Sequence, residues 1–227
     1  MDWTTTFLKV DTYWCTKFTP PINTLLIVLV CFYVYFSNNN VSLGIPLLNS
    51  EHWVTYFMCS VSHFTNSHFF GNISSIIIFG TLLEIIHGSF ASFIIFWYSA
   101  TSGVLWFAAI ENRVSLYRGA SPGVYGIMGA YLAHTIINWK EAPFRFFWFF
   151  LLIFEVANIL VVYYYSYEYR TSVAHSSHVF GFIQGVLIGI IVLKNVVVRK
   201  WEIILQIFSG ILSFTLIILA TTIIYIK

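Results

Sequence analysis

The stretch RGASPGVYG (residues 118–126) places one hydroxyl group, that of Ser121, at the start of a long apolar run. A run of about 20 mostly apolar residues can cross a bilayer as a helix, so the stretch predicts the beginning of a membrane span. Ser121 fits two roles at this position. A serine before a helix, with proline at the first helical position, is an ordinary N-cap. The same hydroxyl is a nucleophile if a base on another helix can take its proton.

The composition is that of a membrane protein. Of the 227 residues, 59% are hydrophobic, 20% are aromatic and only 9% are charged, whereas a soluble domain has roughly 25% charged residues. The net charge of +2 is small and the charges are scattered, which excludes a nucleic-acid-binding surface. Three cysteines, Cys15, Cys31 and Cys59, have no C-x-x-C or Cys/His spacing, so we expect neither a disulfide framework nor a structural zinc site.

Seven apolar segments have the length of membrane spans and leave almost no residues for a soluble domain. We therefore predict an all-α polytopic membrane protein, with a short cytoplasmic N-terminus (residues 1–20) and a single transmembrane domain (residues 21–227). No repeat and no low-complexity run divides the chain. The predicted spans are approximately 21–37, 67–86, 90–110, 121–139, 146–165, 174–194 and 202–225.

The basic residues of the loops predict the orientation. With a cytoplasmic N-terminus, seven of the 11 Lys and Arg residues lie on the cytoplasmic side and four on the outer side, as the positive-inside rule favours. The second, fourth and sixth spans then begin at the outer face. The longest connection, residues 38–66, carries turn formers followed by Trp53 and Phe57, which is typical of a loop at the membrane interface.

Polar residues gather at the starts of these three spans. The second span opens with HFTNSHFFGN (residues 63–72), in which His68 and Asn72 share one helix face. The sixth opens with AHSSHVFGFIQG (residues 174–185), which contains His178. Ionisable residues are costly inside a membrane, so their gathering at one depth predicts a functional site. Peptide-bond hydrolysis needs a hydroxyl, a base and donors for an oxyanion, and these residues and the serine supply all three.

Small residues on two of the spans predict a close helix interface. Glycine recurs every four residues in the sixth span, on the face that carries His178, and the start of the fourth span has a set of its own. Small residues at this spacing allow helix backbones to approach closely in a bilayer, which would bring an imidazole and a hydroxyl together. The glycines are Gly181, Gly185 and Gly189 in the sixth span, and Gly119, Gly123, Gly126 and Gly129 at the fourth.

These motifs resemble those of the rhomboid intramembrane serine proteases. HFTNSHFFGN is similar to the family's H-x4-H-x3-N signature, GASPGVYG (119–126) to its G-x-S motif followed by tyrosine, and HVFGFIQG (178–185) to its H-x-x-G-x-x-x-G. LLEIIHGSF (82–90) and IINWKE (136–141) also resemble eukaryotic members, so the resemblance covers about residues 50–195. A seventh span at about 202–225, behind a six-helix core, resembles the secretory-pathway type.

The resemblance implies a role for each matching residue. Ser121 would be the nucleophile and His178 the general base and acid, with the ring of Tyr125 packed against His178. His68, Asn72 and the Ser121 backbone N–H would form the oxyanion hole. The resemblance implies no third acid, no cofactor and no metal. The residues expected to support the site are His63, Gly119, Gly123, Gly181 and Gly185.

Two departures from the family pattern concern the catalytic chemistry. Pro122 stands where members usually have a small residue, and the loop's usual Trp-Arg pair is represented by Trp53 followed by Val54. His175 is a competing base, but only His178 has the glycine spacing that follows it.

Other polar residues have structural interpretations. His63 could be a loop residue with no part in catalysis, and Glu84, well along its span, is expected to be a structural hydrogen-bond partner. A metal cluster of four histidines would lack carboxylate and cysteine ligands and would leave Ser121 and Asn72 unexplained, so we expect no metal. The histidines in question are His63, His68, His175 and His178.

The sequence thus predicts a rhomboid-type serine endopeptidase that cleaves single-span membrane proteins in or near their transmembrane segments. The alternative is an inactive rhomboid-fold protein that binds membrane clients. A transporter is a third class, without the paired broken spans that would support it. We expect a multi-pass protein of the eukaryotic secretory pathway or plasma membrane, with its site facing the lumen or the extracellular side and with no nucleic-acid partner.

Overall fold

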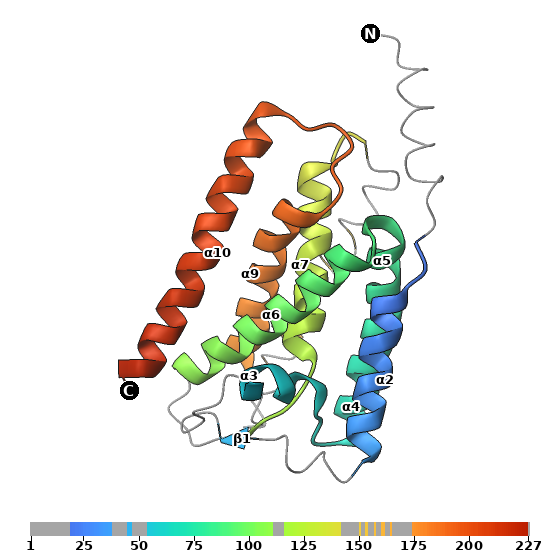
Figure 1. Cartoon of the computed structure of the whole chain (residues 1–227), viewed down its shortest axis with the longest axis vertical. Coiled ribbons are helices and arrows are strands. Elements are labelled where there is room, and N and C mark those ends of the chain that lie inside the picture. The colour runs from blue at the N-terminus through green and yellow to red at the C-terminus, as the bar shows by residue number, and fades with distance from the viewer. Residues whose placement is uncertain are drawn as a thin grey trace.

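The structure, a computed structural model, is a bundle of helices (Figure 1). The longer helices are α2 (Ile22–Phe36), α4 (Asn66–Ser75), α5 (Thr81–His87), α6 (Ser89–Ile110), α7 (Ser121–Ile137), α9 (His175–Val192) and α10 (Lys200–Ile226). The short elements are α3 (Val54–Met58), the 3-10 turn η3 (Cys59–Val61), the π-helical turn η4 (Ile76–Gly80), and the strands β1 (Ile45–Pro46) and β2 (Leu116–Tyr117). The structure describes residues 19–37, 45–46, 54–110, 116–141 and 174–226, and the single positions 150, 153, 157, 160, 161 and 164.

The described helices confirm the predicted all-α membrane fold. Helices α2 and α7 coincide with the predicted first and fourth spans. The predicted fifth span, residues 146–165, lies almost entirely outside the described residues, as do nearly all of residues 1–20. The short antiparallel pairing of β1 with β2 was not predicted from the sequence. Among the residues that the structure describes, four helical segments are long and apolar enough to cross a membrane: Asn66–His87, Ser89–Ile110, His175–Val192 and Lys200–Ile226.

The central helices α7 and α9 are in backbone contact. A β-carbon built on Gly185 would overlap the carbonyl oxygen of Gly126, and one on Gly181 would lie 2.9 Å from the Cα of Pro122. Any residue larger than glycine would therefore force the helices apart. The contact is of the kind that small residues at four-residue spacing allow in a membrane.

The second span is one continuous helix, Asn66–His87, with η4 in its middle. Beyond this turn, Glu84 accepts hydrogen bonds from the backbone N–H groups of Asn23 (2.7 Å) and Thr24 (2.8 Å) and from the Thr24 hydroxyl (2.7 Å). The first N–H groups of a helix have no intrahelical partner, so the carboxylate caps α2 and ties it to the second span. The prediction that Glu84 is a structural hydrogen-bond partner is confirmed.

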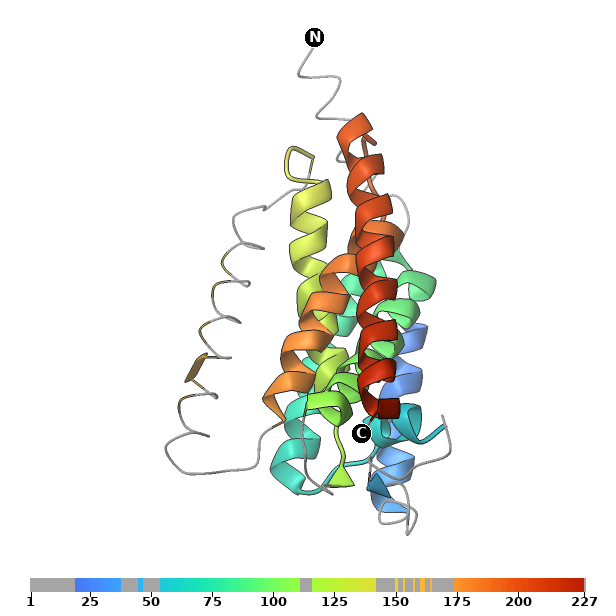
Figure 2. The same ribbon diagram turned by 90° about the vertical axis from the view of Figure 1, so that its left-hand side faces the viewer.

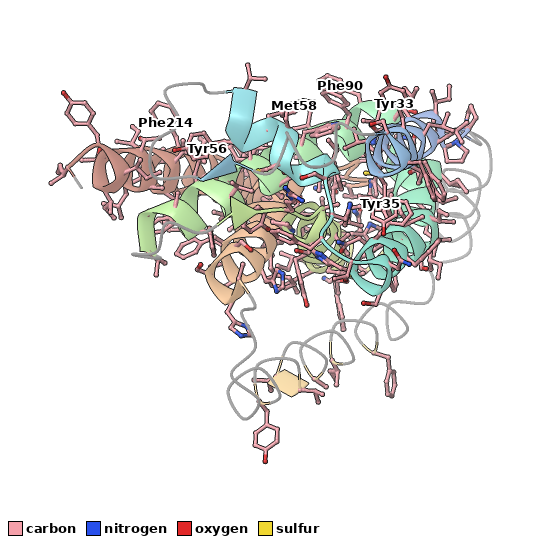
Figure 3. The ribbon with its side chains drawn as sticks, turned by 90° about the horizontal axis from the view of Figure 1, so that it is seen from below. Tyr33, Tyr35, Tyr56, Met58, Phe90 and Phe214 are labelled. Carbon is pink, nitrogen blue, oxygen red and sulfur yellow. The ribbon has the colours of Figure 1, made fainter. Side chains whose placement is uncertain are left out.

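Helix α10 covers one side of the bundle (Figures 1 and 2). It is joined to the interior by Ser213, whose hydroxyl donates to the side-chain oxygen of Gln184 in α9 (2.7 Å) and lies 3.0 Å from the Tyr98 hydroxyl of α6. Phe214 on α10 and Tyr33 on α2 point away from the bundle at its two opposite edges (Figure 3). Exposed apolar side chains of this kind are expected where a helix faces lipid.

The two ends of the bundle differ in chemistry. At one end, His87 and His134 share a hydrogen bond of 2.9 Å, and the backbone N–H of Lys194 donates to the His87 Nδ1 (3.0 Å). The side-chain amide of Asn138 donates to the Lys194 carbonyl (2.9 Å) and closes this network. The starts of α4, α7 and α9 lie at the other end, beside β1 and α3 (Figure 1).

Candidate active site

Ser121 and His178 share a hydrogen bond across the α7–α9 interface, with 2.9 Å between the Ser121 Oγ and the His178 Nε2. Ser121 is the first residue of α7, Ala120 is its N-cap, and no side chain caps the helix. The interpretation of Ser121 as a helix cap is therefore wrong, because its hydroxyl is directed to an imidazole instead. The cap interpretation required proline at the first helical position, whereas Pro122 is the second residue of the helix.

The imidazole of His178 is held by its neighbours in the first turns of α7 and α9. The Tyr125 ring lies one turn below Ser121 and packs on the His178 ring, with 4.5 Å between ring centroids and 30° between planes. His175 is the first residue of α9, and the structure brings His178 rather than His175 to the serine hydroxyl.

His68 and Asn72 lie on the face of α4 that approaches the loop before Ser121. The Thr65 hydroxyl caps α4 by accepting a hydrogen bond from the His68 N–H (3.3 Å). A β-carbon on Gly119 would lie 2.5 Å from the Cε1 and 2.8 Å from the Nε2 of His68, and Gly119 has a φ of 144°. The site thus requires glycine at residue 119 for both its backbone conformation and the space that the imidazole fills.

The side-chain amide of Asn72 is an unused donor. Asn72 is 8% exposed, and its Nδ2 is buried without a hydrogen-bond partner among the residues that the structure describes. A buried donor left without a partner costs about 1–3 kcal/mol. The backbone N–H of Ser121, at the first position of α7, has no intrahelical partner either. The Asn72 amide on α4 and the Ser121 N–H at the start of α7 are thus two unused donors.

His63 supports the loop that leads to Ser121. Its ring is fully buried, lies 5.2 Å from the His68 ring, and accepts a hydrogen bond from the Ala120 N–H (3.5 Å). Burial, with a smaller contribution from His68, lowers the pKa of His63 to about 3. The neutral ring can therefore keep an acceptor nitrogen towards Ala120 at any physiological pH.

The structure adds a residue that the sequence did not single out. The Tyr117 hydroxyl donates to the Ser177 Oγ (3.1 Å), beside His178. A tyrosine four residues before the serine carries no motif, so only the folded chain could reveal it.

Neither cysteine chemistry nor a metal site accompanies these residues in the described part of the chain. Cys31 and Cys59 are buried free thiols, and Cys15 lies outside the described residues. Within the described ranges, no three His, Cys, Asp or Glu side chains are close enough together to hold a metal ion.

Comparison with known proteins places the chain in a family. The family model described as the Rhomboid domain matches residues 50–195. This chain belongs to the rhomboid family. It is 30% identical over 225 residues to Rhomboid-related protein 1 of Caenorhabditis elegans, an alignment covering 85% of this chain and 61% of that protein. It is 28% identical over 153 residues to RHOMBOID-like protein 1 of Arabidopsis thaliana, covering 67% of this chain and 38% of that protein. The chain thus spans less than two thirds of either relative.

The structure accounts for the proline that departs from the usual rhomboid pattern. A β-carbon on Gly103 of α6 would lie 2.5 Å from the Cβ of Pro122, and Gly181 of α9 contacts the backbone of Pro122. In this rhomboid protein the proline ring therefore lies against Gly103 and the Pro122 backbone against Gly181, and the Ser121 hydroxyl keeps its bond to His178. Trp53, from the second departure, lies outside the described residues.

Proposed function

We propose that this rhomboid protein is an intramembrane serine protease. The observation that carries the proposal is the 2.9 Å hydrogen bond between the Ser121 hydroxyl and the His178 imidazole, formed between two helices of a membrane protein. A nucleophile and a base within hydrogen-bonding distance are the parts that acyl transfer needs first. The unpartnered amide of Asn72 supplies the second requirement, a donor for developing negative charge.

The reaction would run in two halves. In the first, the Ser121 Oγ attacks the carbonyl carbon of the scissile bond while His178 Nε2 takes the hydroxyl proton. The C–N bond then breaks, and His178 passes that proton to the leaving amine. This leaves an acyl ester on Ser121. In the second half, a water molecule gives its proton to His178 and attacks the ester, and His178 returns the proton to Ser121 as the carboxyl product leaves.

The oxyanion formed in each half needs donors that already point to it. Asn72, the Ser121 N–H and His68 are proposed for this role, and one such donor is typically worth 10²–10³ in rate. The Tyr125 ring would keep the imidazole oriented in place of the acid that orients histidine in a three-residue site. His68 is kept near the serine by the absence of a side chain at Gly119.

The substrates we propose are single-span membrane proteins. A transmembrane helix has its backbone groups paired internally, so its peptide bonds become accessible only after local unwinding. We therefore expect helix-breaking or small residues near the cleaved bond. With the N-terminus in the cytoplasm, the site would face the lumen or the extracellular side, from which water would reach the acyl ester.

The second candidate is a rhomboid-fold protein that binds membrane clients without cleaving them. Pro122 favours it, because proline directly after the serine removes one backbone N–H from the region where an oxyanion would lie. The Ser121 N–H remains, however, so the proposed donor set is intact.

A fluorophosphonate probe separates the two candidates, because it reacts with an activated serine and needs no knowledge of the substrate. We expect labelling of the purified wild-type protein and its loss in both Ser121→Ala and His178→Ala. His175→Ala is the matched control and should label at the wild-type rate, since His178 is the histidine bonded to the Ser121 hydroxyl. Folded wild-type protein that stays unlabelled would favour client binding.

A further inference from the structure

Tyr117 lies at the junction of the segments that lead to the two reacting residues. It belongs to β2, which pairs with β1, and is 4% exposed. Its ring packs on Phe107 of α6, with 5.0 Å between centroids. Residues 119 and 120 follow and are themselves bonded, with the Gly119 N–H donating to the Cys59 carbonyl (3.1 Å). The backbone hydrogen bond of Gly119 thus holds the segment that leads to Ser121. The Tyr117 hydroxyl makes a separate bond, to α9.

The hydroxyl of Tyr117 bonds to the helix that carries the base. It donates to the Ser177 Oγ at 3.1 Å, and Ser177 in turn donates to the Ala174 carbonyl at 2.7 Å. Ser177 directly precedes His178 and is fully buried. The hydroxyl protons of Tyr117 and Ser177 therefore each have a defined acceptor. The two bonds run from β2 to the Ala174 carbonyl at the start of α9.

Burial raises the pKa of Tyr117, so the phenol stays protonated and keeps its bond to Ser177. The Ser121 hydroxyl lies near the same phenol and slightly lowers the pKa of Tyr117. One side chain thus lies near the nucleophile and bonds the residue next to the base.

We propose that Tyr117 is a positioning residue, whose hydroxyl, through its bond to Ser177, holds the first turn of α9 at the separation from Ser121 that proton transfer requires. The inference rests on the proposed function for its catalytic consequence, but its geometric content, a bridge between β2 and α9, stands without it. Ser177 is the second half of the bridge. A misplacement of about 1 Å between reacting groups can lower a rate by 10²-fold, so one bond at this point carries a measurable effect.

Tyr117→Phe removes only the hydroxyl and leaves the ring on Phe107. The matched control is Tyr98→Phe, which removes a partly buried phenol hydroxyl, the one bonded to Ser213 in α10. The readout is fluorophosphonate labelling, resolved into the maximal inactivation rate (kinact) and the probe's binding constant (KI). We expect Tyr117→Phe to lower kinact by about tenfold to a hundredfold with KI within about twofold, as expected for misplaced reacting groups. Tyr98→Phe should change neither.

A merely structural role would give a different pattern. It would lower the melting temperature and the fraction of protein that labels, with an unchanged kinact for the molecules that remain folded. Ser177→Ala breaks the same bond from the other side and serves if Tyr117→Phe does not fold. The double variant should lose no more than the single ones, because both act on one bond. A wild-type kinact in Tyr117→Phe or Ser177→Ala overturns the inference.

Wild-type protein that does not label at all would contradict the proposed function. The bridge between Tyr117 and Ser177 would then be tested by measuring distances in structures. In experimental structures of the wild type and Tyr117→Phe, we expect the separation between the Ser121 Oγ and His178 Nε2 to grow from hydrogen-bonding distance to beyond about 3.5 Å, where no hydrogen bond remains. An unchanged separation in the variant would overturn the bridge.

Discussion

Gly185 of α9 and Gly126 of α7 lie so close together that a β-carbon on Gly185 would overlap the Gly126 carbonyl oxygen. Both residues lie within two turns of the hydrogen-bonded pair, His178 on one helix and Ser121 on the other. The distance between the two reacting atoms is therefore set by how closely two backbones pack, and the motif glycines act through that packing.

Replacement of Gly185 by valine should separate the helices. We expect a loss of stability of about 1–3 kcal/mol, the usual range for overpacking, and a loss of fluorophosphonate labelling that exceeds the loss of folded protein. Thermal melting in detergent and labelling rate measure the two effects. Gly71→Ala is the control, because a β-carbon there meets nothing within 4 Å. Equal labelling rates in both variants would show that close packing does not set the geometry.

Gly119→Ala should displace the His68 ring from the site. The substitution places a β-carbon 2.5 Å from the His68 Cε1 and imposes a φ of 144° on alanine. Gly88→Ala is a matched control, since Gly88 also has a positive φ (94°) but lies at the opposite end of the bundle. We expect both variants to lose stability and only Gly119→Ala to lower the labelling rate per folded molecule. A normal rate in Gly119→Ala would exclude His68 as an oxyanion donor.

Asn72→Ala should lower the labelling rate without lowering the melting temperature. The Asn72 Nδ2 has no partner among the described residues, so its removal costs the folded state no hydrogen bond. Loss of one oxyanion donor typically lowers the rate by 10²–10³. Asn138→Ala gives the opposite pattern, because Asn138 donates to the Lys194 carbonyl and accepts from the Val196 N–H far from the serine. Destabilisation of Asn72→Ala with an unchanged rate would assign Asn72 a structural role.

Glu84→Gln should destabilise the bundle. The carboxylate accepts three hydrogen bonds from Asn23 and Thr24, whereas an amide would point its NH₂ group at one of those donors. A buried donor without an acceptor costs about 1–3 kcal/mol, which a melting curve in detergent would detect. Thr24→Val removes one of the three bonds and should have a smaller effect. A Glu84→Gln protein as stable as the wild type would show that the carboxylate does not cap α2.

Apolar length and glycine spacing were enough to predict much of the fold. The predicted spans 90–110 and 202–225 differ from α6 and α10 by at most two residues at either end. The π-helical turn η4 was not predicted, since IIIFG (residues 76–80) is an ordinary apolar stretch in which nothing local marks a wider turn. The pairing of β1 with β2 joins residues more than 60 positions apart and depends on tertiary structure.

The residues of the candidate site also fall into those that the sequence predicts and those that it does not. Ser121 and His178 stand out in the sequence because each begins an apolar span and is followed by glycines at helical spacing. Tyr117 and Ser177 have no such mark, because a tyrosine and a serine near a membrane interface are common and their bond exists only after β2 and α9 have met.

The most direct test of the central claim is an experimental structure of the protein after reaction with a fluorophosphonate. We predict a covalent bond from phosphorus to the Ser121 Oγ, with the phosphoryl oxygen about 2.7–3.1 Å from both the Asn72 Nδ2 and the Ser121 backbone nitrogen, the range expected of oxyanion donors. His178 should remain stacked on Tyr125 beside the adduct. A folded protein with no adduct on Ser121 would contradict the role of Ser121 as the nucleophile. An adduct whose oxygen points away from Asn72 would contradict the role of Asn72 as an oxyanion donor.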